Sequence, residues 1–285
     1  MPWCFTVAPT DGEYPMPNPE KAYKNLDFLN SKAARTIRIL CEYEEPKARF
    51  EAEGVENTIV MFGSARIRSE AEATQVLEDA KAALADGSGD QEAVETAEKR
   101  LRLARYYEMS VELARRLTEW SEGRDGPDYH ICSGGGPGIM EAANRGASLV
   151  PGAKSVGLGI SLPFEAGVNE YTPEALAFEF HYFFMRKLWF LYLAKAVIIC
   201  PGGFGTLDEF FETLTLIQTG KISRPLPLVL FGDSYWSRVL NLEAMAEEGT
   251  ISPGDTDLFL MTDSIDEAFE YVVSRLEAVE RGEEV

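Results

Sequence analysis

Histidine is scarce in this sequence, and the cysteines do not form a pattern that would hold a metal. His130 and His181 are the two histidines, and the four cysteines lie far apart without a CxxC pair. Zinc sites draw on clustered cysteine and histidine ligands, and disulfide frameworks need organised cysteine spacings. We therefore expect reduced structural thiols and a protein that uses no metal.

Long apolar runs are also missing. No run of about 18 apolar residues, the length that begins to span a bilayer, occurs in the chain. The first twenty residues contain neither the basic start nor the apolar core of a signal peptide. We therefore expect a cytoplasmic protein that has no membrane partner.

Positive charge is in short supply. The chain has 27 Lys and Arg residues against 47 Asp and Glu residues, and its formal net charge is −20. Because binding of DNA or RNA depends on neutralising many phosphates with basic side chains, we expect no nucleic-acid polymer as a partner. A single mononucleotide is compatible with this charge, since backbone amides and one or two basic side chains suffice to bind it.

Strands and helices alternate along most of the chain. The expected strands lie at 58–62, 129–133, 155–160, 197–200, 226–231 and 258–261, and each is followed by a turn or a helical pattern. This order predicts an α/β fold with a doubly wound, mostly parallel, Rossmann-like sheet that carries helices on both faces. Ligands of such sheets bind at the carboxyl ends of the strands, near the switch point of the topology.

The domain organisation follows from the same pattern. Residues 1–57 are expected to form an extended arm and a helical preface, in which Ser31 would cap a helix and Pro46 would break it. Residues 58–285 are expected to form a single Rossmann-like domain. Within that domain, residues 69–122 are rich in Ala, Glu, Lys, Arg and Leu, and they predict a helical insertion of two helices.

The stretch 196–212, AVIICPGGFGTLDEFFE, is the centre of the sequence. It predicts a buried strand, a glycine turn and the start of a helix. Gly202, Gly203 and Gly205 have no Cβ, so the backbone N–H groups of this turn can point inward and a bulky anion can come close. We interpret this turn, together with Thr206, as a phosphate-binding cradle.

A carboxylate beside that cradle needs an explanation, because like charges repel. Thr206 and Glu209 are three residues apart, so on the following helix they share a face. Stabilisation of the helix dipole is the structural alternative for such a carboxylate, and Asp208 suits that role. Glu209 is therefore our candidate for chemistry.

A second glycine turn follows the strand at 129–133, in the sequence GGGPGIMEAANRGA. Its spacing is not GxGxxG, which favours a mononucleotide over NAD. Tight helix–sheet packing is the alternative explanation for these glycines. The weaker candidates for substrate contact here and after the first strand are Gly63, Ser64, Gly135, Gly136, Glu141 and Asn144. Glu141 and Asn144 would equally suit an ordinary first turn of a helix.

Two basic residues interrupt a strongly apolar stretch. Residues 178–194 begin as a strand and continue as a helix, and Met185, Arg186 and Lys187 lie within them. The basic side chains either extend along the apolar surface to solvent or have an anionic partner, such as a carboxylate or a phosphate. The preceding segment, 164–177, predicts a loop able to cover a pocket.

The pair Arg186-Lys187 followed by PGGFGTLDE at 201–209 resembles the Lonely Guy (LOG) family, whose signature is an RK pair upstream of PGGxGTxxE. The segments MFGSAR and GGGPGIMEAANRGA are similar to other turns of that family. The resemblance covers about residues 58–268 and implies a hydrolase that cleaves the N-glycosidic bond of a nucleoside 5′-monophosphate, such as AMP or a cytokinin ribotide. The products would be the free base and ribose 5-phosphate.

The resemblance also implies roles for particular residues. Arg186 and Glu209 would be the catalytic pair, and the PGGFGT turn would take the phosphate. Glu209 would stabilise positive charge on the ribose ring, while Arg186 would hold Glu209 ionised. Met185 and Lys187 are weaker candidates for substrate contact. No cofactor is required, and a homodimer or larger homo-oligomer would complete the pocket.

Two other functions remain open at this point. One is a non-catalytic nucleotide-binding or carrier protein of the same fold. The other is lysine decarboxylation, a label that some family members bear. A pyridoxal phosphate enzyme needs a lysine placed for a Schiff base, and no His-Lys dipeptide of the decarboxylase type occurs.

Overall fold

The computed structural model describes residues 19–161 and 167–283. The chain divides into two compact units, 1–41 and 42–285. Most of the expected N-terminal arm and part of the expected loop at 164–177 lie outside the described residues. In the first unit, α1 (Leu26–Asn30) is flanked by short 3-10 turns at Ala22–Lys24 and Lys32–Ala34, and α2 (Arg35–Glu53) begins there.

The second unit contains a parallel sheet, which confirms the predicted fold class. In the described residues it has seven strands in the order β4-β3-β2-β1-β5-β6-β7, and every neighbouring pair is parallel. The strands are β1 (Thr58–Phe62), β2 (His130–Ser133), β3 (Ser155–Ile160), β4 (Ala177–Phe180), β5 (Ala194–Ile199), β6 (Leu228–Phe231) and β7 (Leu260–Thr262). The central strands are buried on both faces, as their continuous apolar runs predict.

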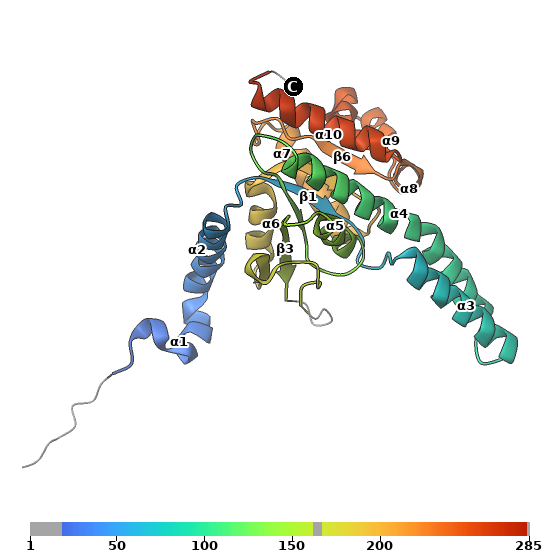
Figure 1. Cartoon of the computed structure of the whole chain (residues 1–285), viewed down its shortest axis with the longest axis horizontal. Helices are drawn as coiled ribbons and strands as arrows, with labels where there is room; N and C mark the ends of the chain where they lie inside the picture. The colour runs from blue at the N-terminus through green and yellow to red at the C-terminus, as the bar shows by residue number, and fades with distance from the viewer. Residues whose placement is uncertain (1–18, 162–166, 284–285) are drawn as a thin grey trace, which may run out of the picture. The chain divides into compact units, whose positions relative to one another are not determined.

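Helices cover both faces of this sheet (Figure 1). The helices that follow β1 are α3 (Glu70–Asp86), α4 (Gln91–Glu122), α5 (Ile139–Ser148), α6 (Phe183–Tyr192), α7 (Phe204–Gln218), α8 (Asp233–Val239), α9 (Leu242–Glu247) and α10 (Ile265–Glu280). Ile59 and Met61 of β1 pack in the core with α4, α5 and α10. Because side chains alternate along a strand, Phe62 points to the opposite face, where its ring lies 4.7 Å from that of Phe190 on α6.

The predicted helical insertion forms a hairpin of α3 and α4, which lie side by side (Figure 1). Ser69 and Glu72 form a capping box at the start of α3, and Gly87 ends that helix in the left-handed conformation. The side chain of Asp90 then caps α4. These local signals explain why the insertion forms two helices, as the sequence predicted. Among the described residues, no helix has the length and apolarity needed to cross a membrane.

Pro46 does not break the preface helix, so that prediction was wrong. It is buried inside α2. A proline at this position removes the N–H that would bond the carbonyl of Glu42, four residues earlier. In this structure the indole Nε1 of Trp189 donates to that carbonyl oxygen at 3.0 Å. A tertiary hydrogen bond therefore replaces the bond that the proline removes.

Two further element boundaries, at Ser31 and at the last strand, differ from the sequence-based expectation. Ser31 ends α1 and precedes a 3-10 turn, where its side chain makes no capping hydrogen bond. Residues 233–247 form two helices, α8 and α9, because the side chain of Asn241 caps a new helix. The last strand begins at Leu260, since Pro253–Leu258 form a 3-10 helix.

Candidate active site at the switch point of the sheet

The topology reverses between β1 and β5. The chain leaves β1 toward β2 on one side, whereas it leaves β5 toward β6 on the other. The carboxyl ends of β1 and β5 therefore flank the crevice where doubly wound sheets bind ligands. The turn at 201–206 follows β5, and the turn at 63–66 follows β1, so both predicted turns lie at this crevice.

Backbone hydrogen bonds join the three predicted glycine turns. The N–H of Ser64 donates to the carbonyl of Pro201 at 3.0 Å, and the N–H of Ile139 donates to the carbonyl of Ser64 at 3.1 Å. Ser64 thus links the turn after β5 to the start of α5. The structure brings together segments that are more than 130 residues apart in the sequence.

Close packing requires glycine in the turns that follow β1 and β2. A Cβ on Gly63 would overlap the side chain of Ile139, and a Cβ on Gly138 would overlap the carbonyl oxygen of Ser64. Gly135 has φ +71°, a conformation that glycine adopts readily. Gly135 and Gly136 are both buried. These turns therefore fit the packing explanation, and they bring α5 close to the end of β1.

The PGGFGT turn has a different character. A Cβ on Gly202 would overlap the hydroxyl of Thr206, so Thr206 covers that glycine. Around Gly203 and Gly205, in contrast, a Cβ would meet no atom of the described residues within 4 Å, and both residues are exposed. Gly203 is the N-cap of α7 and has no side chain to cap it. The start of α7 is therefore open, and its N-cap provides no side-chain hydrogen bond to the first N–H groups, an arrangement that suits an anion.

Glu209 lies one turn further along α7, on its buried face. Its side chain is 5% exposed, and Thr206 on the same face is 6% exposed. The prediction that these two residues share a face is consistent with this placement. A buried carboxyl next to an open helix start is unusual, because burial penalises its charged form.

The surroundings of Glu209 bring its pKa close to neutrality. Burial raises the pKa of the Glu209 carboxyl to about 7, while the positive charges of Lys187 and Arg186 act to lower it. The carboxylates of Glu212 and Asp208 act to raise it. Arg186 therefore favours the ionised form, as expected, but burial outweighs its effect. A group with this pKa can both accept and release a proton at neutral pH.

Lys187 of α6 is bound to acidic side chains of α7. Its Nζ lies 3.0 Å from Oδ2 of Asp208 and 2.7 Å from Oε2 of Glu212. Burial lowers the pKa of Lys187, but its hydrogen bonds to Glu212 and Asp208 outweigh burial, and the pKa lies above its ordinary value. Lys187 is thus a firmly charged ammonium that joins α6 to α7 and acts on the charge of Glu209.

The neighbours of Lys187 on α6 differ in exposure. Met185 is buried. Arg186 is partly buried, and its guanidinium lies 5.1 Å from the ring of Phe183 and 5.5 Å from the ring of Phe190. Arg186 and Lys187 both act on the charge of Glu209, so α6 and α7 together supply the charged groups of the candidate site.

Asn144 of α5 has its hydrogen-bonding capacity filled by protein groups. Its Oδ1 accepts from Ser133 Oγ at 2.6 Å and from Asn169 Nδ2 at 3.0 Å. Its Nδ2 donates to Ser155 Oγ at 3.0 Å and to the carbonyl of Val156 at 3.2 Å. Asn144 is fully buried. We therefore assign it to the packing of β2, β3 and the following loop rather than to substrate contact.

Sequence reasoning missed three side chains that support these turns. Asn169 donates from Nδ2 to the carbonyl of Gly135 at 3.0 Å. Tyr107 of α4 donates its hydroxyl to Oε1 of Glu141 at 2.6 Å, and Tyr235 of α8 donates to the carbonyl of Gly202 at 2.8 Å. Because each contact joins segments far apart in the chain, no local sequence pattern identifies them.

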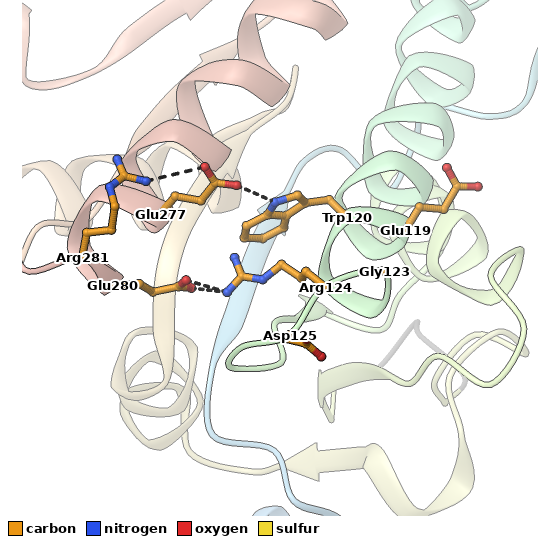
Figure 2. Close-up of a pocket in the computed structure, with 8 residues that line it drawn as sticks. All are labelled: Glu119, Trp120, Gly123, Arg124, Asp125, Glu277, Glu280 and Arg281. Atoms are coloured by element: carbon orange, nitrogen blue, oxygen red, sulfur yellow. Dashed lines mark hydrogen bonds and ion pairs between the residues drawn. The ribbon is translucent and has the colours of Figure 1, made fainter.

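A separate pocket of about 440 Å³ lies near the ends of α4 and α10 (Figure 2). Since α4 ends just before β2 begins, this pocket lies near the amino ends of the strands, whereas the glycine turns lie at their carboxyl ends. Arg124 Nη2 lies 2.6 Å from both carboxylate oxygens of Glu280, and Trp120 Nε1 donates to Glu277 at 3.1 Å. These contacts bind the ends of the two helices together, and we assign the pocket no ligand.

Comparison with known proteins finds one family model and several relatives. The family model described as "Possible lysine decarboxylase" matches residues 140–272. A cytokinin riboside 5′-monophosphate phosphoribohydrolase of Rhodococcoides fascians is 33% identical over 88 residues, which are 31% of this chain and 44% of that protein. The Arabidopsis thaliana phosphoribohydrolase LOG3 is 41% identical over 61 residues, 21% of this chain and 28% of that protein.

Longer matches have lower identity. The Arabidopsis thaliana phosphoribohydrolase LOG2 is 27% identical over 149 residues, 52% of this chain and 65% of that protein. The match with the Rhodococcoides fascians protein spans less than half of that protein's length. Among solved structures, the protein TM1055 aligns with a TM-score of 0.43 and 18% identity, over 79% of this chain and 99% of that chain.

Proposed function

We propose that this protein, a member of the Lonely Guy (LOG) family, hydrolyses the N-glycosidic bond of a nucleoside 5′-monophosphate. The family model and the cytokinin riboside 5′-monophosphate phosphoribohydrolases among the relatives, LOG3 included, confirm the resemblance predicted from the RK pair and the PGGFGT turn. The observation that carries the proposal is Glu209, a buried carboxyl with a pKa of about 7 beside an open helix start. The products would be a free base and ribose 5-phosphate.

In the proposed reaction, the 5′-phosphate binds the first turn of α7 at Gly203 and Gly205. This contact fixes the ribose, and binding energy from a remote group can orient the reacting centre. As the C1′–N9 bond of a purine nucleotide breaks, positive charge develops on the ribose ring. The ionised Glu209 stabilises this charge and orients the attacking water.

Proton transfer completes the proposed reaction. Water forms a new C1′–O bond and gives one proton to Glu209, while the base leaves with the electrons of the broken C1′–N9 bond. The base takes up a proton from solvent and Glu209 releases its proton to solvent, so the carboxylate is restored. Arg186 contacts the substrate and favours the carboxylate form of Glu209. Lys187 holds Asp208 and Glu212 beside the site through its two ion pairs. We propose AMP or a cytokinin ribotide as the substrate.

Lysine decarboxylation, the activity in the description of the family model, is less well supported by this site. A Schiff base requires a neutral amine as the nucleophile. The pKa of Lys187 lies above its ordinary value, because its hydrogen bonds to Glu212 and Asp208 outweigh the effect of burial. The lysine next to the candidate site is therefore held in the charged form, which does not react with a carbonyl group.

We also propose that the protein forms a homodimer or a larger homo-oligomer. Phe184, Leu188 and Tyr192 follow one another at intervals of four residues on α6, and all three are exposed. Phe204, at the start of α7, is 92% exposed. A contiguous exposed apolar face of this kind is typical of a protein–protein interface. The cytoplasmic location and the independence from nucleic-acid polymers remain proposals from the sequence.

Chromatography of nucleotide after incubation with the purified protein tests the reaction. AMP, an isoprenylated AMP and other purine monophosphates are compared, and the proposal predicts free base and ribose 5-phosphate from at least one of them. Intact nucleotides that nevertheless bind, as shown by calorimetry, would instead support a carrier protein. An absorbance scan for bound pyridoxal phosphate separates the decarboxylase alternative.

A further inference from the structure

The helix that carries Arg186 is held at its start by a side chain of α2. Oε1 of Glu42 accepts a hydrogen bond from the backbone N–H of His181 at 2.8 Å, and Oε2 accepts one from the N–H of Tyr182 at 3.1 Å. Tyr182 is the N-cap of α6, and its own side chain makes no capping hydrogen bond. Glu42 thus supplies from a distant segment the anionic acceptor that other helices obtain locally.

The backbone of Tyr182 connects this contact to the candidate site. Its carbonyl oxygen accepts hydrogen bonds from the N–H of Met185 at 3.1 Å and from the N–H of Arg186 at 3.2 Å. Tyr182 is therefore bound by Glu42 through its N–H, and its carbonyl accepts the first hydrogen bonds of α6. A shift of Tyr182 would move the backbone of Arg186, which lies directly on the next turn.

Glu42 is itself fixed by the contacts of its helix. Its carbonyl accepts the hydrogen bond from Trp189 Nε1 on α6, at 3.0 Å. Further along α2, Arg49 Nη1 donates to the carbonyl of Ala177 in β4 at 3.0 Å. The ring of Phe50 lies 5.3 Å from the ring of Trp189. These contacts hold residues 42–50 against β4 and α6, so the backbone that carries the Glu42 carboxylate is fixed in position.

We propose that Glu42 is a positioning residue for the hydrolysis, because it sets the start of α6 and thereby the position of Arg186 beside Glu209. This inference rests on the proposed function. The proposed phosphate turn belongs to α7, whereas these hydrogen bonds of Glu42 go to His181, Tyr182 and Trp189, at the start of α6 and within it. Loss of the carboxylate should therefore lower kcat more than it raises KM for the nucleotide.

The test compares Glu42→Ala and Glu42→Gln with Glu44→Ala, a change of an exposed glutamate on the same helix. Amide hydrogen exchange of the full chain is measured first. In Glu42→Ala the amides of His181 and Tyr182 should exchange about tenfold faster, the size expected for loss of charge-assisted capping bonds. Exchange in α7 should stay unchanged. Glu42→Gln keeps one acceptor oxygen and should be intermediate, while Glu44→Ala should match the natural protein.

Kinetics on the most active nucleotide then test the consequence. We expect kcat of Glu42→Ala to fall about tenfold, with partial recovery in Glu42→Gln and a KM within about twofold of the natural protein. If Glu42→Ala does not fold, the Glu42→Gln variant is judged by the same two measurements.

The outcomes separate the inference from the function on which it rests. Unchanged exchange at His181 and Tyr182 in the Glu42 variants overturns the inference, whatever the activity. Faster exchange with an unchanged kcat overturns the link to catalysis. A natural protein that hydrolyses no nucleotide overturns the proposed function, and with it the catalytic part of the inference, while the exchange data still decide whether Glu42 holds α6.

Discussion

Glu209 has a carboxyl whose protonation changes across neutral pH, since burial raises its pKa to about 7. The proposed reaction uses the ionised form, because a carboxylate stabilises positive charge on the ribose ring. A raised pKa means that this form is lost as the pH falls. We therefore expect kcat to decline on the acid side with a midpoint near pH 7.

Lys187 should control the position of that midpoint. Its positive charge lowers the pKa of Glu209, and its removal would also leave Asp208 and Glu212 without their ion pairs. In Lys187→Met we expect the acid-side midpoint of kcat to move to higher pH, by about one unit. At high pH, where Glu209 is ionised in both proteins, the rates should converge. Lys221→Met, at an exposed position, is the control, and an unmoved midpoint in Lys187→Met would contradict this role.

The charged residues that the structure brings together in the candidate site could be singled out from the sequence, but their partners could not. Arg186, Lys187 and Glu209 stand out because the motif places them together and because charges are costly in apolar surroundings. Asp208 and Glu212, in contrast, look like ordinary residues on a helix surface. Their pairing with Lys187 depends on the packing of α6 against α7, which the sequence does not specify.

At the scale of the element, the two glycines of the PGGFGT turn should respond differently to the same substitution. A Cβ at Gly202 would overlap Thr206, so Gly202→Ala should lower the free energy of unfolding by about 1–3 kcal/mol. A Cβ at Gly203 meets open space, so Gly203→Ala should leave stability nearly unchanged. That Cβ would nevertheless occupy the proposed phosphate site, and we expect KM to rise about tenfold, or about 1.4 kcal/mol.

Denaturant unfolding and steady-state kinetics of both variants check this prediction. Equal losses of stability would show that the two glycines serve packing alone. An unchanged KM in Gly203→Ala would remove the first turn of α7 from the phosphate site.

The continuous helix at Pro46 leads to a second prediction for an element. Trp189→Phe removes the indole donor to the Glu42 carbonyl and should lower the free energy of unfolding by about 1–3 kcal/mol. In a Pro46→Ala background the loss should be smaller by about 1 kcal/mol, because the new N–H of residue 46 can bond that carbonyl. A double-mutant cycle by urea unfolding measures this difference, and additive losses would refute the explanation for Pro46.

Helix ends set by local side chains could be predicted, whereas the course of α2 could not. The side chains of Ser69 and Asp90 cap α3 and α4 by accepting a hydrogen bond from the N–H group three residues further along the chain. Such short spacings are visible in the sequence. Pro46 is tolerated because of Trp189, which lies more than 140 residues further along the chain. A local rule about proline therefore gave the wrong boundary.

For the whole molecule, the class of the sheet was predictable from the alternation of apolar strands and helices. The order of the strands places the switch point between β1 and β5 and explains why the glycine turns meet. That order depends on which strands pair, and the strand patterns alone did not reveal it. The hydrogen bonds of Asn144 and Asn169 depend on it in turn.

The proposed homo-oligomer gives a prediction at the same scale. Leu188 lies between Phe184 and Tyr192 on the exposed face of α6. A charge placed there should oppose burial of that face against another subunit, so Leu188→Glu should shift the mass from dimer toward monomer. Multi-angle light scattering measures the mass, and Val239→Glu, at an exposed position on α8, is the control. A natural protein that is monomeric at all concentrations would contradict the proposal.

The most direct measurement is base release from the preferred nucleotide by the natural protein and by Glu209→Gln, followed by chromatography. Glutamine has nearly the same shape but cannot carry the charge or accept the proton, so we expect the rate to fall by about 10²–10⁴-fold. Circular dichroism should show an unchanged fold, and calorimetry should show that the nucleotide still binds. Full activity of Glu209→Gln would contradict the account, because the reaction would then proceed without the carboxylate on which the proposed mechanism depends.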